Sequence, residues 1–369
     1  MTLARRELLR DAAALAAISV AIRSAGAQGE GLKVGKGLRD LSDETLDFFR
    51  MLGVRHVAMP SSYSLTRRRR GLVPATDTGP RSDAPMAPWD REELIRIQER
   101  LTQKGLVPIM VRLGRLQQII HGGPSAAVEL AAVKANVRLA GDLSIPVMEY
   151  SFTALRGSEG YGRTEGRGGL GQRDYDEART RDLPPLRNVG THTREQLWER
   201  LHGFLREVIP VAEEAGVRLA MHPNDPPIPS YRGVAQPVRS LSDQRELIEL
   251  VNSPANGITL DTGVTTEMGE DAVEAIRFFG GRDRINHVHF RNVQVEVPYY
   301  KYLEVPHHAG DCDMLGCMRA FREVGYRYLL IPDHTPEFTG DTVGSEMGWA
   351  FAIGYLAALR HAAESEGAA

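Results

Sequence analysis

The sequence predicts a closed (β/α)8 barrel, in which eight parallel strands alternate with eight helices around one core. Short runs rich in Val, Ile and Leu alternate eight times with amphipathic stretches of helix length. No G-x-G-x-x-G motif follows the first of these runs, which disfavours the structural alternative, an open doubly wound sheet that binds a dinucleotide. Residues 28–369 are therefore expected to form one barrel domain, within the usual size range of this fold.

Each predicted strand is short. Several of them follow a glycine suited to ending the preceding helix, namely Gly53, Gly105, Gly216 and Gly325. In chain order the predicted strands are 32–36, 54–59, 106–112, 146–152, 217–222, 257–262, 285–291 and 328–333.

The predicted helices lie between these strands. Asp90, Thr193 and Ser242 are typical N-cap residues, and Glu or Gln follows each of them within three positions. In chain order the predicted helices are 42–52, 90–104, 125–142, 193–215, 242–252, 269–279, 314–324 and 345–362.

Two connections, 60–88 and 153–192, are unusually long. Both follow predicted strands, so both are expected at the C-terminal face of the barrel, where barrel enzymes carry their active sites. Loops of this length at that face are typical of binding loops and lids. The first contains the basic run 67–70, for which we expect a solvated loop, with attraction of an anion as the alternative.

The composition is that of an ordinary soluble globular protein, with 42% hydrophobic and 25% charged residues. The formal net charge of −3 indicates no nucleic-acid partner. The two cysteines, Cys312 and Cys317, are expected on one helix. They are too few for a disulfide framework or a structural zinc site, and no bridge between them is expected.

The N-terminus resembles an export signal. Arg5-Arg6 precedes an apolar stretch, 12–22, and Ala25-Gly26-Ala27 offers a cleavage site. This pattern is typical of a twin-arginine signal over residues 1–27 and predicts a periplasmic or exported protein. An ordinary amphipathic helix in a cytoplasmic protein is the alternative. The apolar stretch is too short to cross a bilayer, so no membrane span is expected.

The last four predicted strands each end near a residue that can bind a metal, in order His222, Asp261, His289 and Asp333. In a barrel these strand ends converge on one axis, where two imidazoles and two carboxylates require a cation. Mixed nitrogen and oxygen ligands favour Mn²⁺, Fe²⁺, Co²⁺, Ni²⁺ or Zn²⁺ over Ca²⁺. The alternative for each residue alone is a helix cap or a satisfied loop group. His287 is expected on the same strand face as His289.

Several motifs along the chain form a recognisable set, namely His222-Pro223-Asn224-Asp225-Pro226-Pro227, the stretches 145–152 and 252–257, Arg163-Thr164, His289-Phe290-Arg291, His307 with 310–314, and Pro332-Asp333-His334. Together these motifs resemble the mannonate dehydratase family of xylose-isomerase-like barrels. The similarity extends from about residue 54 to 359 and is densest after residue 219. It implies a metal, usually Mn²⁺, held at His222, Asp261, His289 and Asp333, with Fe²⁺, Co²⁺, Mg²⁺ or Zn²⁺ as alternatives.

The sequence departs from the family pattern at three positions. Asp261 stands where the family has a metal-binding Cys, and a carboxylate is also an acceptable ligand. Thr335 replaces the Gly of the family's Pro-Asp-His-Gly motif. The stretch 348–351 reads Gly-Trp-Ala-Phe near the point where the family's C-terminal helix supplies a catalytic Tyr. The last departure bears on the dehydration chemistry rather than on the fold or the metal.

The resemblance implies a metal-dependent lyase that dehydrates D-mannonate or a similar sugar acid to a 2-keto-3-deoxy acid. Such a reaction needs a group that binds the carboxylate, an acid and a base. Arg291 and Arg163 are candidate carboxylate clamps, because a guanidinium can bind a carboxylate through two hydrogen bonds. His334 is the candidate acid or base, with support of the neighbouring ligand as its alternative role.

Three further residues are open to two interpretations each. His307 is either a substrate contact or a surface histidine. Tyr150 and Glu149 end the fourth strand, and one of them must face the barrel axis. Tyr150 is a candidate catalytic residue, and Glu149 is a candidate ligand, as in related isomerases and epimerases.

Two other functions compete with dehydration. The first is a metal-dependent sugar isomerase or epimerase on the same barrel. The second is an exported sugar-binding protein without catalysis, which the four ligand positions disfavour. In each case the expected partner is a small sugar acid or sugar, and homo-oligomerisation is left open.

Overall fold

The computed structural model describes residues 31–60, 84–342 and 344–366, and these form a closed parallel barrel of eight strands. The strands stand around the barrel in sequence order, and each pairs in parallel with its neighbours. The fold class and all eight predicted strands are confirmed, with each end within two residues of its prediction. The strands are β1 (Lys33–Gly37), β2 (His56–Met59), β3 (Val107–Arg112), β4 (Val147–Ser151), β7 (Arg218–His222), β10 (Asn256–Asp261), β11 (Ile285–His289) and β14 (Leu329–Ile331).

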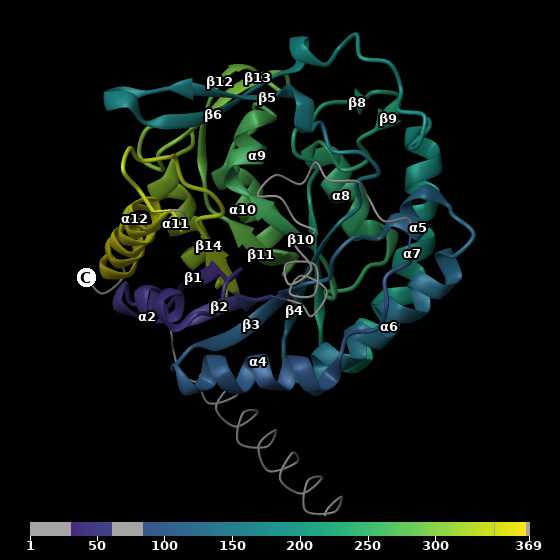
Figure 1. Ribbon diagram of the computed structural model, residues 1–369, viewed down its shortest axis with the longest axis horizontal. Coiled ribbons are helices and arrows are strands. Elements are labelled where there is room, and N and C mark those ends of the chain that lie inside the picture. Colours follow the sequence, from purple (N-terminus) through teal and green to yellow (C-terminus); the bar gives the residue numbers. More distant parts are fainter. Residues whose placement is uncertain (1–30, 61–83, 343, 367–369) are drawn as a thin grey trace, which may run out of the picture.

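The predicted helices surround the barrel (Figure 1). Two short helices were not predicted, α5 (Gln117–His121) and α9 (Thr262–Glu267). The eight predicted ones are α2 (Asp43–Met51), α4 (Arg91–Gln103), α6 (Ala126–Asp142), α7 (Arg194–Ala215), α8 (Leu241–Leu250), α10 (Ala272–Gly280), α11 (Met314–Glu323) and α12 (Glu346–Ser365).

Two of the three predicted N-caps are confirmed. The side chains of Asp90 and Thr193 accept hydrogen bonds from backbone N–H groups in the first turns of α4 and α7. The third prediction is wrong, because α8 begins earlier than expected. Ser240, and not Ser242, caps this helix by accepting from the backbone N–H of Asp243, and Ser242 lies inside the first turn.

Apolar side chains pack on both sides of the barrel strands. A large core lies between the outer face of the strands and the helices. A smaller cluster inside the barrel consists of Ala58, Ile109, Met110, Val147, Ala220, Leu329 and Ile331. The polar side chains at the carboxyl ends of the strands lie above this inner cluster, at the end that we call the mouth of the barrel.

A second sheet stands at the mouth, where the sequence predicted loops. The connection 153–192 contains β5 (Tyr161–Glu165) and β6 (Gly171–Asp176), which pair in antiparallel fashion. The chain after β11 forms β12 (Asn292–Val297) and β13 (Lys301–Val305). The four strands join in the order β12-β13-β6-β5, and Figure 1 shows them together at one end of the molecule. Segments far apart in the sequence thus meet over the strand ends.

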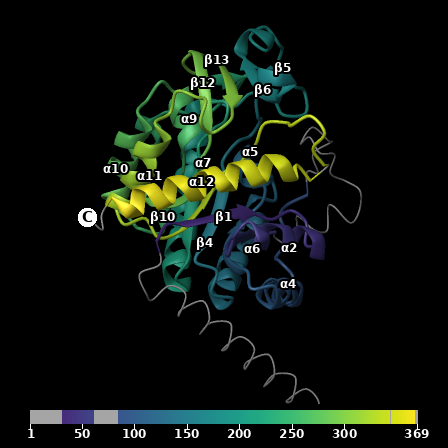
Figure 2. The ribbon, with the colours of Figure 1, turned by 90° about the vertical axis from the view of Figure 1, so that its left-hand side faces the viewer.

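The C-terminal helix α12 lies alongside α11 and β1, as Figure 2 shows. The residue just before β1 is joined to the end of α12 there, because the backbone N–H of Leu32 donates to Glu364. Cys312 precedes α11 by two residues instead of lying within it, and its Sγ is 3.6 Å from the Sγ of Cys317. Both thiols are free.

Two predictions fall on parts of the chain that the structure does not describe. The export signal predicted for residues 1–27 and the basic run 67–70 lie outside the described residues. Among the helices that are described, none has both the length and the apolar character needed to cross a membrane.

Candidate metal centre

Donor atoms from three neighbouring strand ends meet at the mouth of the barrel. His222 Nε2 is 3.1 Å from His289 Nδ1. Asp261 Oδ2 lies 3.7 Å from the first of these nitrogens and 3.6 Å from the second. These three residues form a group that could hold a metal ion. Asp333, two residues beyond β14, joins them with its Oδ1 at 3.4 Å from His289 Nδ1.

These separations match what a metal ion requires. Four ligand atoms placed tetrahedrally at ~2.1 Å from an ion stand about 3.4 Å apart. The observed distances of 3.1–3.7 Å fall around that value. The side chains of Asp261 and His289 are fully buried, and those of His222 and Asp333 are about 15% exposed. His222, Asp261 and His289 are therefore close enough together to share one cation, and Asp333 lies next to His289.

The negative charge of the surrounding carboxylates raises the pKa of His289. Burial acts to lower this pKa, but the carboxylates of Asp333, Glu149 and Asp261 outweigh burial and raise it to about 10. The same three carboxylates act on His222, but there burial and the neighbouring His289 outweigh them and lower its pKa. The carboxylates thus favour the protonated form of His289. A divalent ion bound in this group could replace the positive charge of that proton.

Asp261 has two roles at the end of β10. Its Oδ1 accepts a hydrogen bond from the backbone N–H of Val264, so the side chain caps α9. Its Oδ2 faces the two histidines and also accepts from Arg291 Nε at 3.1 Å. The helix-cap alternative and the ligand interpretation are compatible, because each uses a different oxygen.

Asp333 adopts a backbone conformation that is unusual for a side-chain-bearing residue. Its φ angle is +36°, in the left-handed region. Such strained residues persist only where their surroundings hold them, and they concentrate at functional sites. Here the carboxylate is held between His289 and His334, whose Nε2 is 2.6 Å from Asp333 Oδ2.

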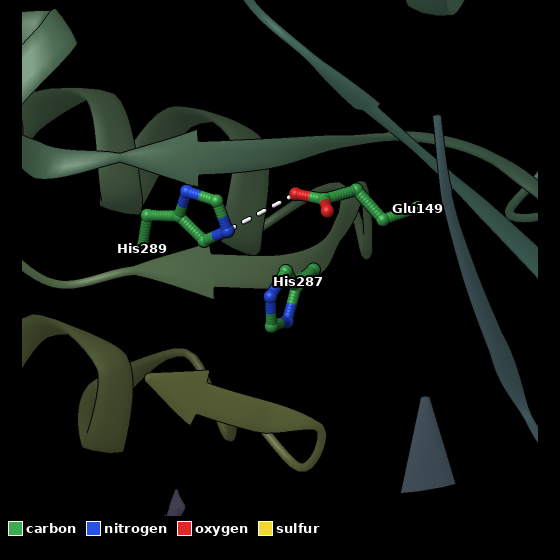
Figure 3. A group of neighbouring side chains, drawn as sticks. All are labelled: Glu149, His287 and His289. Carbon is green, nitrogen blue, oxygen red and sulfur yellow. Dashed lines mark ion pairs between the residues drawn. The ribbon is translucent and has the colours of Figure 1, made fainter. Parts of the chain in front are cut away.

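Glu149 and His287 lie next to His289, on the barrel side of the cluster. Figure 3 shows Glu149 on β4 pointing at His289 on β11, with Oε1 3.0 Å from Nε2. His287 and His289 share a strand face, as predicted, and their ring centroids are 5.1 Å apart. Together the three residues form a second group that could hold a metal. However, the other oxygen of Glu149 pairs with Arg112 Nε at 2.6 Å, which neutralises the carboxylate.

His334 stands between two carboxylates at the mouth. Its Nε2 faces Asp333, and its Nδ1 is 2.9 Å from Glu304 Oε2. Burial opposes protonation, but these two charges raise the pKa of His334 above its ordinary value. The ring is 30% exposed. His334 is therefore a partly open imidazole whose neighbouring carboxylates favour the protonated form that a general acid needs.

Arg291, a predicted carboxylate clamp, lies buried among carboxylates of the protein itself. Its guanidinium is 2% exposed. It pairs with Asp261 at 3.1 Å, Glu267 at 2.7 Å and Asp225 at 3.5 Å. Glu304 and Asp333 follow at 3.8 Å each. Because five acidic side chains of the protein already surround this one cation, little positive charge remains for a substrate. Arg291 instead neutralises the acidic groups around the cluster.

Arg163 and Tyr150, two further predicted catalytic residues, have partners of other kinds in the structure. Arg163 lies on β5, where its half-exposed side chain pairs with the exposed Glu337 at 2.8 Å. Tyr150 points away from the barrel axis and packs against Phe204 of α7, with ring centroids 5.5 Å apart. Of the two residues that end β4, Glu149 is the one that faces the axis, because side chains alternate along a strand.

His307 is buried, which excludes the surface interpretation. It is 1% exposed, and burial lowers its pKa to about 4. Its ring centroid lies 6.3 Å from that of Tyr355 on α12. The neutral ring thus packs in the layer between the β13–α11 connection and the C-terminal helix.

Sequence analysis missed three charged residues of the mouth. Arg112 ends β3 and follows the same strand-end pattern as the predicted ligands, so that pattern could have found it. Arg173 and Glu304 lie on β6 and β13, which were not predicted, and they form an ion pair beside His334. No local signal in the sequence placed these two segments together.

Comparison with known proteins places the second half of the chain in a known family. Residues 179–367 match the family model described as D-mannonate dehydratase (UxuA). A mannonate dehydratase from Enterococcus faecalis is 41% identical over 145 residues, which are 38% of this chain and 40% of that protein. The chain thus spans about two fifths of the length of the curated relatives that it matches.

Solved structures agree on the fold over nearly the whole chain. Mannonate dehydratase from Streptococcus suis serotype 2 superposes with a TM-score of 0.78 at 21% identity, covering 92% of this chain and 96% of that one. A xylose isomerase domain protein from Planctomyces limnophilus gives a TM-score of 0.58 at 14% identity, covering 92% of this chain and 100% of that one. The barrel is of the xylose-isomerase-like type.

Proposed function

Because this chain belongs to the mannonate dehydratase family, we propose that it is a metal-dependent hydro-lyase that acts on D-mannonate or a similar sugar acid. The proposed reaction removes the proton α to the carboxylate and expels the β-hydroxyl as water, which leaves a 2-keto-3-deoxy acid. The observation that carries this proposal is the convergence of His222, Asp261 and His289, with Asp333 beside them, at the mouth of the barrel.

In this proposal the same four residues hold one divalent metal ion. The set of two imidazoles and two carboxylates suits Mn²⁺, with Fe²⁺, Co²⁺, Mg²⁺ or Zn²⁺ as alternatives. A bound metal would supply Lewis-acid stabilisation of the negative charge that develops on substrate oxygens.

His334 is the proposed general acid for the departing hydroxyl. Its two ring nitrogens face Asp333 and Glu304, which favour the protonated ring. Its partial exposure gives a bound substrate access to that proton. Arg173, within 3.3 Å of Nε2, limits how strongly the ring retains it, because the two positive charges repel each other.

A sugar isomerase or epimerase is the second candidate, and one position favours it specifically. Gly348 stands near the point where the family resemblance implies a catalytic tyrosine. A Cβ atom at this position would lie 2.5 Å from Thr335 Oγ1, so the packing leaves no room for a side chain. An isomerase on this barrel would not depend on that tyrosine.

Metal analysis and substrate turnover test the two candidates together. The purified protein should contain close to one divalent ion per chain, and a chelator should abolish activity that added Mn²⁺ then restores. Conversion of D-mannonate to a 2-keto-3-deoxy acid supports the dehydratase. Interconversion of neutral ketoses or aldoses without loss of water supports the isomerase, and metal-independent sugar binding without turnover contradicts both.

We also propose that the protein is exported through a twin-arginine signal at residues 1–27. The proposal rests on Arg5-Arg6, the apolar stretch after it and the small residues at 25–27. A reporter fused after residue 27 should leave the cytoplasm, and changing Arg5-Arg6 to Lys-Lys should retain it. Equal export of both fusions would contradict the proposal.

A further inference from the structure

The mouth of the barrel contains two arginines in very different states. Arg291 is buried among acidic side chains of the protein, which leave little positive charge for a ligand. Arg112, at the end of β3, pairs with Glu149 alone among the residues that the structure describes, and it does so only through Nε. The two terminal amino groups of Arg112 thus remain available.

Arg112 faces the barrel axis. It is in register with Glu149 on β4, which in turn is in register with Ala220 on β7, a member of the inner apolar cluster. Paired residues of neighbouring parallel strands point to the same side of the sheet. The Arg112 side chain is nonetheless 58% exposed. It is therefore an axial group that reaches solvent through the mouth.

Only one carboxylate separates Arg112 from the candidate metal centre. Glu149 contacts Arg112 Nε with one oxygen at 2.6 Å and His289 Nε2 with the other at 3.0 Å. Glu149 therefore fixes the guanidinium while leaving its outer edge open. A small ligand at the mouth can touch this edge and the metal-binding residues at the same time.

Arg156 adds positive charge on the same side. It follows β4 and is anchored by Asp225, with Nη2 3.3 Å from Oδ2, while its side chain stays 39% exposed. Its charge acts on Arg112, since it opposes the rise in the pKa of Arg112 caused by Glu149. Two cations that repel each other at an open surface favour an anion between or beside them.

We propose that Arg112 binds the carboxylate of the substrate through its two terminal amino groups, so that the site selects sugar acids over neutral sugars. This inference rests on the proposed function and specifies its substrate class as an anion. The planar guanidinium edge matches a carboxylate in a two-hydrogen-bond geometry. In this arrangement the substrate's carboxylate lies on the β3 side of the mouth, and its hydroxyl-bearing carbons extend toward His289 and Asp333.

The test compares a charged with an uncharged ligand on the Mn²⁺-loaded protein. Binding of D-mannonate and of the neutral alditol D-mannitol is measured by titration calorimetry for the parent protein, Arg112→Gln and Arg112→Lys. Loss of charge-assisted hydrogen bonds should weaken D-mannonate binding by about 10- to 100-fold in Arg112→Gln. The affinity for D-mannitol should change less than about twofold, because it has no carboxylate. Arg112→Lys keeps the charge but lacks the two coplanar amino groups, so its affinity for D-mannonate should lie between those of the parent protein and Arg112→Gln.

Arg319→Gln is the matched control. This arginine lies on α11, is half exposed and pairs with Glu366, away from the mouth. Its loss should leave both affinities unchanged. Metal content and melting temperature are measured for every variant, because Arg112 also contacts Glu149. If Arg112→Gln loses metal, or weakens both ligands equally, Arg112 only positions Glu149 and the inference is wrong.

The remaining outcomes separate the inference from the proposed function. Unchanged D-mannonate affinity in Arg112→Gln overturns the inference even if the parent enzyme dehydrates D-mannonate. Arg112-dependent binding of D-mannonate without any keto-acid product supports the inference and overturns the proposed function. A parent protein that binds D-mannitol but not D-mannonate overturns both.

Discussion

The mouth of the barrel formed by β7, β10, β11 and β14 differs from the part formed by β3 and β4 in the charge that it presents. The first part places imidazoles and carboxylates together, in a group that could hold a cation. The second part presents the open edge of Arg112, which suits an anion. The family match covers residues 179–367, which include the first part and exclude the second. Under the two proposals above, one half of the barrel holds the metal and the other half recognises the substrate.

The two arginines illustrate the same difference at the level of single residues. Both would be read from the sequence as cations at strand ends. Arg291 is enclosed by Asp225, Asp261 and Glu267, so it contributes to the structure of the acidic half. Arg112 has a single partner and an exposed outer edge. The number of carboxylates around a guanidinium, rather than its position on a strand, decides whether it can bind a ligand.

The largest effect is expected from removing the imidazole that both candidate metal groups share. His289→Ala should lose nearly all bound metal and lower turnover by more than about 100-fold, the upper range for outer-shell partners of metal ligands. Elemental analysis and a keto-acid assay measure the two quantities. His361→Ala, an exposed histidine on α12, is the control and should change neither. Stoichiometric metal in His289→Ala would contradict the assignment of this half as the metal side.

Arg291→Met should mainly affect stability. Removing the cation takes a close positive partner away from Asp225, Asp261 and Glu267, which should lower the free energy of unfolding by about 3–5 kcal/mol. Urea unfolding of the metal-free protein measures this directly. Arg319→Met, at an exposed ion pair, should leave the free energy of unfolding nearly unchanged. If Arg291→Met is as stable as the parent protein but binds D-mannonate weakly, Arg291 binds the substrate carboxylate. In that case the proposed difference between Arg291 and Arg112 is wrong.

Two substitutions at Asp261 distinguish its proposed role as a metal ligand from its role as the cap of α9. Asp261→Asn keeps an oxygen to cap α9 but removes one negative charge, so metal affinity should fall about tenfold or more. Asp261→Cys replaces an oxygen donor with a softer thiolate, and the metal preference should shift from Mn²⁺ toward Zn²⁺. Activity against metal concentration is measured for all three proteins. The same preference and affinity throughout would mean that Asp261 serves only as a helix cap and as a partner of Arg291.

The smallest effect is expected at Tyr150, on the outer side of β4. Its hydroxyl is buried without a hydrogen-bond partner in the part of the chain that the structure describes, so Tyr150→Phe removes no interaction. The free energy of unfolding should change by less than about 1 kcal/mol, and kcat should stay the same. A large loss of kcat at unchanged stability would restore Tyr150 as a catalytic candidate.

Local patterns in the sequence determined the barrel and the position of its candidate metal-binding residues. Eight apolar runs separated by capped helices leave few other folds, and successive parallel strand ends must converge, so His222, Asp261, His289 and Asp333 could be grouped before any coordinates were known. The resemblance to mannonate dehydratases was also visible in motifs along the chain, and the family match confirms it.

Only the tertiary structure decided which charged side chains are available to bind a ligand. Whether an arginine is neutralised depends on carboxylates that arrive from distant segments. Glu267 reaches Arg291 from α9, and Glu304 reaches His334 from a strand that local sequence did not reveal. The same holds for Glu149 and Tyr150, since period-two alternation requires them to face opposite sides but does not say which one faces the axis. Side-chain direction and long-range pairing are set by packing across the whole barrel, and no short segment of sequence contains that information.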